Sequence, residues 1–295
     1  MAETLGRHKE FLTFLVVVVG LSGCDLFPSP ATEQPIEERY EHIRPAWSRD
    51  GKSVAFTATF NGVAGIYAVD TTGGNLRLIH AGNAIGLSYS PDSTWIAFSE
   101  GRNLFKQKLN GDSLTMLTGV GSDIRPAWSP DGKAIAFVRN NDVWKLDLAS
   151  GTQSLLYEFA DYPSWDPLNL EVIVLVAFYS NGGQWSFFFY SVRDDTTSPG
   201  LLFGFDALSQ CFLPAVSPSG HEIVMTLIPA TNEYPELWII DLTTARIAQL
   251  TNDGARDGAW SPDGKAIVYT RTQAGDGGLW IMNSDGTGKH RLTSP

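Results

Sequence analysis

One stretch of this chain returns almost unchanged at intervals along the sequence. Residues 125–137 read RPAWSPDGKAIAF, residues 44–56 read RPAWSRDGKSVAF, and residues 257–269 read DGAWSPDGKAIVY. The Ser-Pro-Asp-Gly segment at residues 129–132 has the residues of a type I turn, with proline at the second position and glycine at the fourth. Apolar, strand-favouring residues flank this turn. The stretch therefore predicts a β-hairpin, and its recurrence predicts a repeat architecture.

The first residue of this turn marks six repeats along the chain. It falls at Ser48, Ser90, Ser129, Asp166, Ser217 and Ser261. The intervals are 42, 39, 37, 51 and 44 residues, and such periods, filled with short strands, are typical of propeller blades. Each repeat has room for four strands, of which the first ends at Trp47, Tyr89, Trp128, Trp165, Val216 or Trp260.

The fourth strand of each repeat is expected to be the outermost one. The predicted ranges are Leu76–His80, Leu114–Leu117, Ser154–Glu158, Gly200–Phe205, Ile247–Leu250 and His290–Thr293. Because the repeats begin with an innermost strand and end with an outermost one, we expect the ring to close by face-to-face packing of the first and last blades, without a shared blade.

The repeat pattern also resembles a known family. The order A-W-S-P-D-G-K, then apolar-x-aromatic, then W/Y-x-x-D, then L-T is similar to the repeat of the TolB-type β-propeller, over roughly residues 40–295. The resemblance implies an all-β, six-bladed β-propeller with four antiparallel strands per blade, and an envelope-associated scaffolding role. The turns at residues 166–169 (DPLN) and 217–220 (SPSG) depart from the consensus.

The first residues have a different character. Arg7 and Lys9 precede the apolar run 11–21, which is too short to span a bilayer but fits the apolar region of a signal peptide. Residues 21–24 (LSGC) resemble a bacterial lipobox, which implies cleavage before Cys24 and lipidation of that cysteine. We therefore expect a lipoprotein signal peptide at 1–23, a lipidated Cys24 with a flexible tether at 24–39, and the propeller at 40–295. The chain would then be lipid-anchored in the bacterial cell envelope, on its periplasmic or extracellular face.

Composition argues against several classes of function. The net charge is −11 and no cluster of Lys and Arg is present, so a nucleic-acid surface is not expected. The five His are dispersed, and neither a zinc motif nor G-x-S-x-G, G-x-G-x-x-G or a P-loop occurs. We expect no cofactor, no metal site and no local catalytic motif. Cys211 is expected to be a small buried apolar residue, and the molecule is expected to be a monomer.

Candidate binding residues lie where each innermost strand begins, because loops converge there at one mouth of a propeller channel. Aligned on the repeat, the charged and aromatic residues at this rim are His42, Arg44, Asp123, Arg125, Asp161, Tyr162, Arg256 and Asp257. Arginines present planar forks that suit carboxylates, although such a rim can also consist of charges that pair with one another.

These residues favour non-catalytic binding of a protein or peptide partner at the channel mouth. Two alternatives stay open. One is a propeller enzyme acting on saccharides, a hydrolase or lyase, whose dispersed channel residues would leave no local motif. The other is a ligand-binding sensor lipoprotein.

Overall fold

The regular structure in the described part of the chain consists of β-strands. The computed structural model describes residues 44–119, 121–179, 184–197, 210–229, 234–272 and 278–293, and these ranges contain 24 strands and no helix. No helix in these ranges is therefore long and apolar enough to cross a membrane. The chain divides into two units, Met1–Arg39 and Tyr40–Pro295, and the strands that the structure describes belong to the second.

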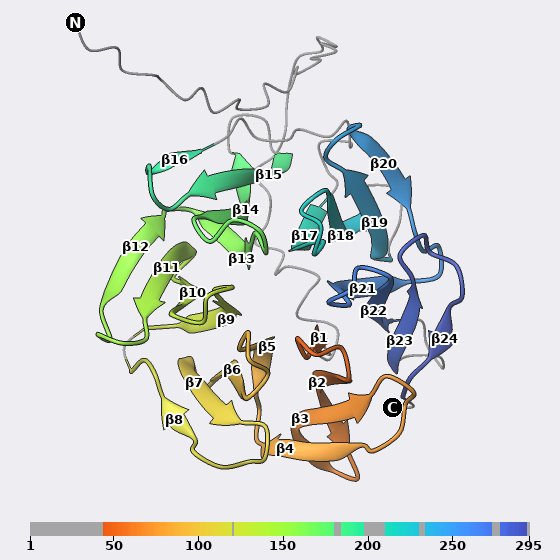
Figure 1. The fold of residues 1–295 in the computed structure, drawn as a ribbon, viewed down its shortest axis with the longest axis horizontal. Helices are drawn as coiled ribbons and strands as arrows, with labels where there is room; N and C mark the ends of the chain where they lie inside the picture. The colour runs from red at the N-terminus through yellow and green to blue at the C-terminus, as the bar shows by residue number, and fades with distance from the viewer. Residues whose placement is uncertain are drawn as a thin grey trace, which may run out of the picture. The chain divides into compact units, whose positions relative to one another are not determined.

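The strands form six antiparallel sheets, each built from four strands that are consecutive in sequence. Figure 1 shows these sheets arranged around a central axis, with one strand of each sheet beside that axis. This arrangement confirms the all-β, six-bladed β-propeller predicted from the repeat. We number the blades 1 to 6 in chain order.

The strands beside the axis are β1 (Ala46–Trp47), β5 (Ile85–Tyr89), β9 (Asp123–Trp128), β13 (Ala160–Trp165), β17 (Gln210–Val216) and β21 (Ala255–Trp260). The second strands are β2 (Ser53–Phe60), β6 (Trp95–Glu100), β10 (Ala134–Arg139), β14 (Val172–Tyr179), β18 (Glu222–Ile228) and β22 (Ala266–Arg271). The third strands are β3 (Val63–Asp70), β7 (Asn103–Lys108), β11 (Asp142–Asp147), β15 (Gln184–Ser191), β19 (Glu236–Asp241) and β23 (Gly278–Asn283). The outermost strands are β4 (Arg77–Ala81), β8 (Thr115–Met116), β12 (Gln153–Tyr157), β16 (Thr196–Thr197), β20 (Arg246–Gln249) and β24 (His290–Arg291).

The innermost strands end at the residues that the repeat predicted in all six blades. The outermost strand of blade 4 differs, because the structure forms it at Thr196–Thr197, paired with Tyr190 and Ser191. The chain reverses directly after β15, where the backbone N–H of Asp194 donates to the hydroxyl of Ser191 at 3.3 Å. The predicted range Gly200–Phe205 lies outside the described residues.

The turn between β9 and β10 shows why its residues recur. The N–H of Gly132 donates to the carbonyl of Ser129 at 2.9 Å. The hydroxyl of Ser129 donates to Asp131 Oδ1 at 2.7 Å and accepts from the N–H of Ala134 at 2.9 Å. Gly132 has φ +74°, a conformation that glycine adopts without steric cost. The recurring serine and aspartate are therefore bonded within the turn, and their role there is structural.

The recurring tryptophans join neighbouring blades. The indole N–H of three of them donates to an alanine carbonyl on the innermost strand of the preceding blade: Trp47 to Ala259 at 3.1 Å, Trp165 to Ala127 at 3.0 Å, and Trp260 to Ala215 at 3.0 Å. Apolar side chains fill the seams between blades, as where Ile135 and Phe137 of blade 3 cluster with Leu104 of blade 2. The hydrophobic core thus lies between the sheets.

The ring closes through the seam between blades 6 and 1. Val54 and Phe56 of β2 lie in one buried cluster with Val268 of β22 and Leu279 of β23. Strands β1 to β4 form a sheet of their own, as do β21 to β24. The predicted closure by packing, without a shared blade, is confirmed.

Candidate functional site

A cavity of about 350 Å³ lies along the axis of the propeller. In each blade the lining begins at a residue within the innermost strand, or at Arg44 just before β1 in blade 1, and continues to the turn that follows the strand. We call the two ends of the cavity the bulge-side mouth, where this lining begins, and the turn-side mouth, at the Ser-Pro-Asp-Gly turns. The residues of the bulge-side mouth are Arg44, Gly86, Arg125, Tyr162, Leu213 and Asp257.

The bulge-side mouth is built from an irregularity that recurs from blade to blade. The register of the innermost strand shifts in blades 2 to 6, as between Asp161 and Ser164 of blade 4. At each shift one residue takes a left-handed backbone conformation: Gly86 (φ +58°), Arg125 (+55°), Tyr162 (+51°), Leu213 (+52°) and Asp257 (+59°). Bulges re-aim side chains, and residues other than glycine seldom adopt positive φ. The fold thus imposes a left-handed conformation on a position whose residue changes from blade to blade.

Arg125 contacts two residues of blade 4 at this mouth. Its Nη1 lies 3.1 Å from Asp161 Oδ2, and its Nη2 donates to the Tyr162 hydroxyl at 3.0 Å. Its guanidinium carbon lies 4.3 Å from the centre of the Tyr162 ring. The side chains of Arg125 and Asp161 are 18% and 26% exposed, so this ion pair is accessible to solvent.

Arg44 approaches the same aromatic ring from another blade. Its guanidinium carbon lies 5.9 Å from the centre of the Tyr162 ring, within the range of a cation–π contact. A Cβ placed on Gly86 would lie 3.6 Å from Arg44 Nη1, so this guanidinium passes beside bare backbone. Blades 1, 3 and 4 are thus brought together around Tyr162, with Asp161 paired to Arg125.

The remaining predicted rim residues have other surroundings. Arg256 Nε lies 2.9 Å from Asp257 Oδ2, and both side chains are almost fully buried, so they neutralise each other. Asp123 is fully buried and binds Arg139 through two hydrogen bonds of 2.6 and 2.7 Å. Asp123 does not line the cavity, which differs from the expected rim position. His42 lies outside the described residues.

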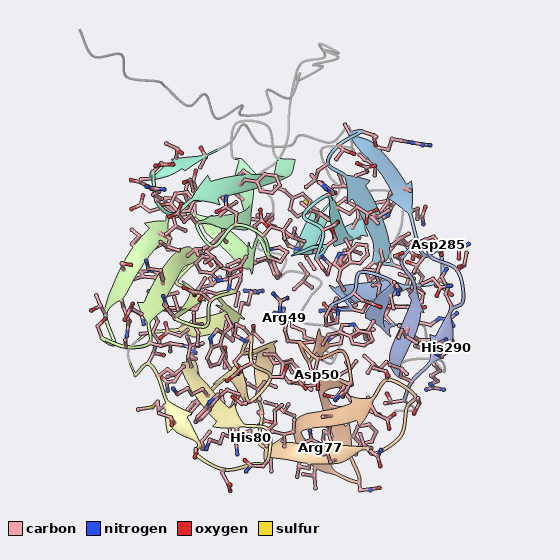
Figure 2. All side chains as sticks on the ribbon, in the orientation of Figure 1. Arg49, Asp50, Arg77, His80, Asp285 and His290 are labelled. Carbon is pink, nitrogen blue, oxygen red and sulfur yellow. The ribbon has the colours of Figure 1, made fainter. Side chains whose placement is uncertain are left out.

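The turn-side mouth carries a residue that sequence reasoning missed. The second residue of the turn is Pro91, Pro130, Pro167, Pro218 or Pro262 in five blades and Arg49 in blade 1, and all six line the cavity. Figure 2 shows Arg49 in the middle of the ring of blades. The signal was present in the sequence, where RPAWSRDGK replaces RPAWSPDGK.

The charge of the cavity is opposite to that of the whole chain. The charged residues that line it are Arg44, Arg49, Arg125 and Asp257. Arg125 pairs with Asp161, and Arg256 pairs with Asp257. The chain as a whole has net charge −11. A concave surface lined by one sign of charge attracts ligands of the other sign, so the cavity suits anionic groups.

Other groups with possible chemistry are accounted for structurally. Among the residues that the structure describes, no group of three or more His, Cys, Asp or Glu could hold a metal ion. Cys211 is 4% exposed, which confirms its predicted burial, and burial raises the pKa of its thiol to about 12. The hydroxyl of Ser48 and the backbone N–H of Lys52 hold the pKa of Asp50 below its ordinary value, as expected for a carboxylate bonded within its turn.

Comparisons with known proteins agree with this architecture. The Tol-Pal system protein TolB of Anaeromyxobacter dehalogenans (strain 2CP-C) is 35% identical over 82 residues, covering 28% of this chain and 18% of that protein. The crystal structure of TolB from Acinetobacter baumannii has a TM-score of 0.70 at 19% identity, covering 80% of this chain and 62% of that one. The chain thus spans less than two thirds of either TolB protein.

An enzyme shares the fold as well. An oligogalacturonate lyase solved in complex with manganese has a TM-score of 0.58 at 15% identity, covering 85% of this chain and 76% of that one. At such identities the structural likenesses show the fold alone. Together the four-stranded blades and the axial cavity define a β-propeller whose blades are formed by sequence repeats. Residues 30–195 match the TolB beta propeller domain, and the chain belongs to that family.

Proposed function

We propose that this protein binds a protein or peptide partner, without catalysis, at the bulge-side mouth of its propeller. One observation carries the proposal: the guanidinium groups of Arg44 and Arg125 both lie over the ring of Tyr162. Arginine and tyrosine dominate the binding energy of many protein interfaces, and guanidinium groups suit carboxylates. The TolB relatives carry the name of the Tol-Pal system, which supports a partner within the cell envelope.

Partner capture tests this proposal. Crosslinking and pull-down from envelope extracts would compare wild type with the double variant Arg44→Ala, Arg125→Ala. The control is Arg193→Ala, Arg246→Ala, which removes the same charge from exposed positions outside the cavity. We expect the mouth variant to recover at least about tenfold less partner and the control to match wild type. Equal recovery by the mouth variant and wild type would refute the proposal.

We further propose that the chain is anchored in the bacterial cell envelope by lipid on Cys24, on the periplasmic or extracellular face. Support comes from the lipobox-like residues 21–24 after a short apolar run, and several acyl chains anchor a protein stably. Metabolic labelling with a palmitate analogue should label wild type and Cys211→Ser but leave Cys24→Ser unlabelled. Label retained in Cys24→Ser would disprove the assignment.

A further inference from the structure

The turn-side mouth differs from the opposite end of the cavity in having an apolar rim with one cation. Five half-buried prolines and the exposed Arg49 form this rim. A proline has no backbone N–H to donate, so the other five rim positions offer a ligand no backbone donor. The polar chemistry of the rim itself is therefore concentrated in the guanidinium of Arg49.

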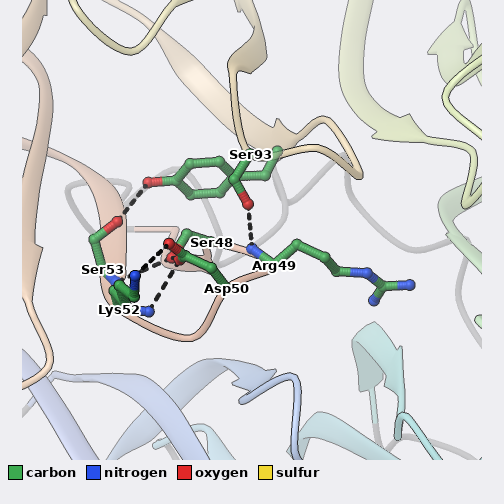
Figure 3. Close-up of polar contacts among 7 residues, drawn as sticks. Ser48, Arg49, Asp50, Lys52, Ser53 and Ser93 are labelled. Atoms are coloured by element: carbon green, nitrogen blue, oxygen red, sulfur yellow. Dashed lines mark hydrogen bonds and ion pairs between the residues drawn. The ribbon is translucent and has the colours of Figure 1, made fainter.

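The backbone of Arg49 is anchored while its side chain extends away. Its N–H donates to the hydroxyl of Ser93 in blade 2 at 2.7 Å. Figure 3 shows the side chain extending from the turn toward the middle of the ring. Within the described residues, no side chain bonds to the Arg49 guanidinium.

The carboxylate nearest to Arg49 in sequence, that of Asp50, bonds to residues of its own turn. Asp50 Oδ1 accepts from the Ser48 hydroxyl at 2.6 Å and from the backbone N–H of Lys52 at 3.1 Å. Asp50 Oδ2 lies 3.9 Å from Lys52 Nζ. These bonds hold the Asp50 carboxylate within the turn (Figure 3), so its charge does not occupy the guanidinium of Arg49.

We infer that Arg49 binds a carboxylate of an extended peptide at the turn-side mouth, with the proline rim against the peptide's apolar atoms. The peptide nature of the ligand rests on the proposed function, whereas the anion site rests on the geometry of Arg49. The planar guanidinium matches a carboxylate with two parallel hydrogen bonds. The site lies at the opposite end of the cavity from Arg44 and Arg125.

The hydrogen-bond donors at the turn-side mouth suit a carboxylate better than other anions. Protein sites for phosphate commonly gather several backbone N–H groups in addition to a cation, and the five prolines exclude that arrangement at their positions. An acidic sugar presents hydroxyls around its ring that need polar partners, and proline side chains supply none. A peptide end that presents one carboxylate and apolar side chains fits the rim better than either.

NMR of protein labelled with ¹⁵N-arginine tests the inference. The probe is acetyl-Gly-Ala-Ala with a free carboxylate, titrated against its amidated form while the Arg49 Nε–Hε signal is followed. We expect a saturable shift with the acid and binding at least about tenfold weaker with the amide, as for loss of a charge-assisted pair. Equal binding of acid and amide, or tighter binding of glucuronate than of the acid, would overturn the inference.

Variants locate the site and separate it from the other mouth. Arg49→Gln keeps the backbone N–H that bonds to Ser93, and Arg49→Pro restores the residue of the other five turns. Both should abolish binding of the acid probe, measured by isothermal titration calorimetry, whereas Arg44→Ala, Arg125→Ala should retain it. Retained binding in Arg49→Gln refutes this inference alone; partner recovery that survives the double substitution refutes the proposed function alone.

Discussion

At the scale of single residues, the bulge-side mouth shows how one position takes on different roles. Gly86, Arg125, Tyr162, Leu213 and Asp257 share a left-handed backbone conformation, although only glycine adopts it freely. The conformation is imposed by the strand register around it. Side chains there can therefore vary between blades, and the variation gives the mouth its arginines and its tyrosine.

Gly86→Ala isolates the energetic cost of that conformation. The nearest atom to the new Cβ would lie at 3.5 Å, an ordinary contact, so the expected loss of stability is only conformational, about 1 kcal/mol. Gly101→Ala, also at positive φ with open space around it, is the matched control outside the cavity. Chemical denaturation should give similar losses for both. A loss several times larger for Gly86→Ala would show that the Cβ displaces Arg44 or Arg125.

Asp123 was predicted to lie at the rim, but the structure buries it and it does not line the cavity. Asp123→Asn would leave the 12%-exposed Arg139 without its counter-charge, and breaking a buried ion pair costs about 3 kcal/mol. Glu171→Gln removes the exposed ion pair with Arg193 and should cost less than about 1 kcal/mol. Partner recovery should be unchanged in the folded Asp123→Asn protein. Reduced recovery with full stability would instead assign Asp123 to binding.

At the scale of structural elements, the seams depend on the recurring tryptophans in two ways. Trp47 bonds to Ala259, whereas the buried indole N–H of Trp128 has no hydrogen-bond partner among the described residues. Trp47→Phe and Trp128→Phe remove a similar volume, but only the first removes a hydrogen bond. We expect Trp47→Phe to be more destabilising by about 1 kcal/mol in denaturant unfolding. Equal losses would mean that packing alone holds the closing seam.

The tight turns predict a dependence of stability on pH. Serine hydroxyls are the main cause that lowers the pKa values of Asp50, Asp92 and Asp263 from their ordinary value of 3.8. A lowered folded-state pKa stabilises the protein above the unfolded-state value, and this contribution is lost as the pH falls through the folded-state value. The thermal midpoint of unfolding should therefore decrease as the pH is lowered from about 5 to about 3. This decrease should be less steep in Asp50→Asn. An identical slope in that variant would contradict the assignment.

At the scale of the whole molecule, the sequence predicted the repeated strands and turns but could not predict which residues of distant blades lie in contact. Six blades, their innermost strand ends and the structural role of the turn followed from local patterns. The approach of Arg44 to Tyr162 was not predictable in the same way, because it joins blades that are not neighbours in sequence. The burial of Asp123 depends on Arg139, at the far end of β10. Arg49 was visible as a departure from the repeat, but its place at the axis required the ring.

The closing seam has one more consequence, for how the protein loses its structure. An open array of repeats has two terminal units, each with a single neighbour, and fraying starts there. Here Val54 and Phe56 of the first blade share a buried cluster with Val268 of the last, so each of these two blades also has a neighbour on its other side. To release either one, two seams must separate at once. The closed ring therefore lacks the terminal units at which an open array of repeats frays.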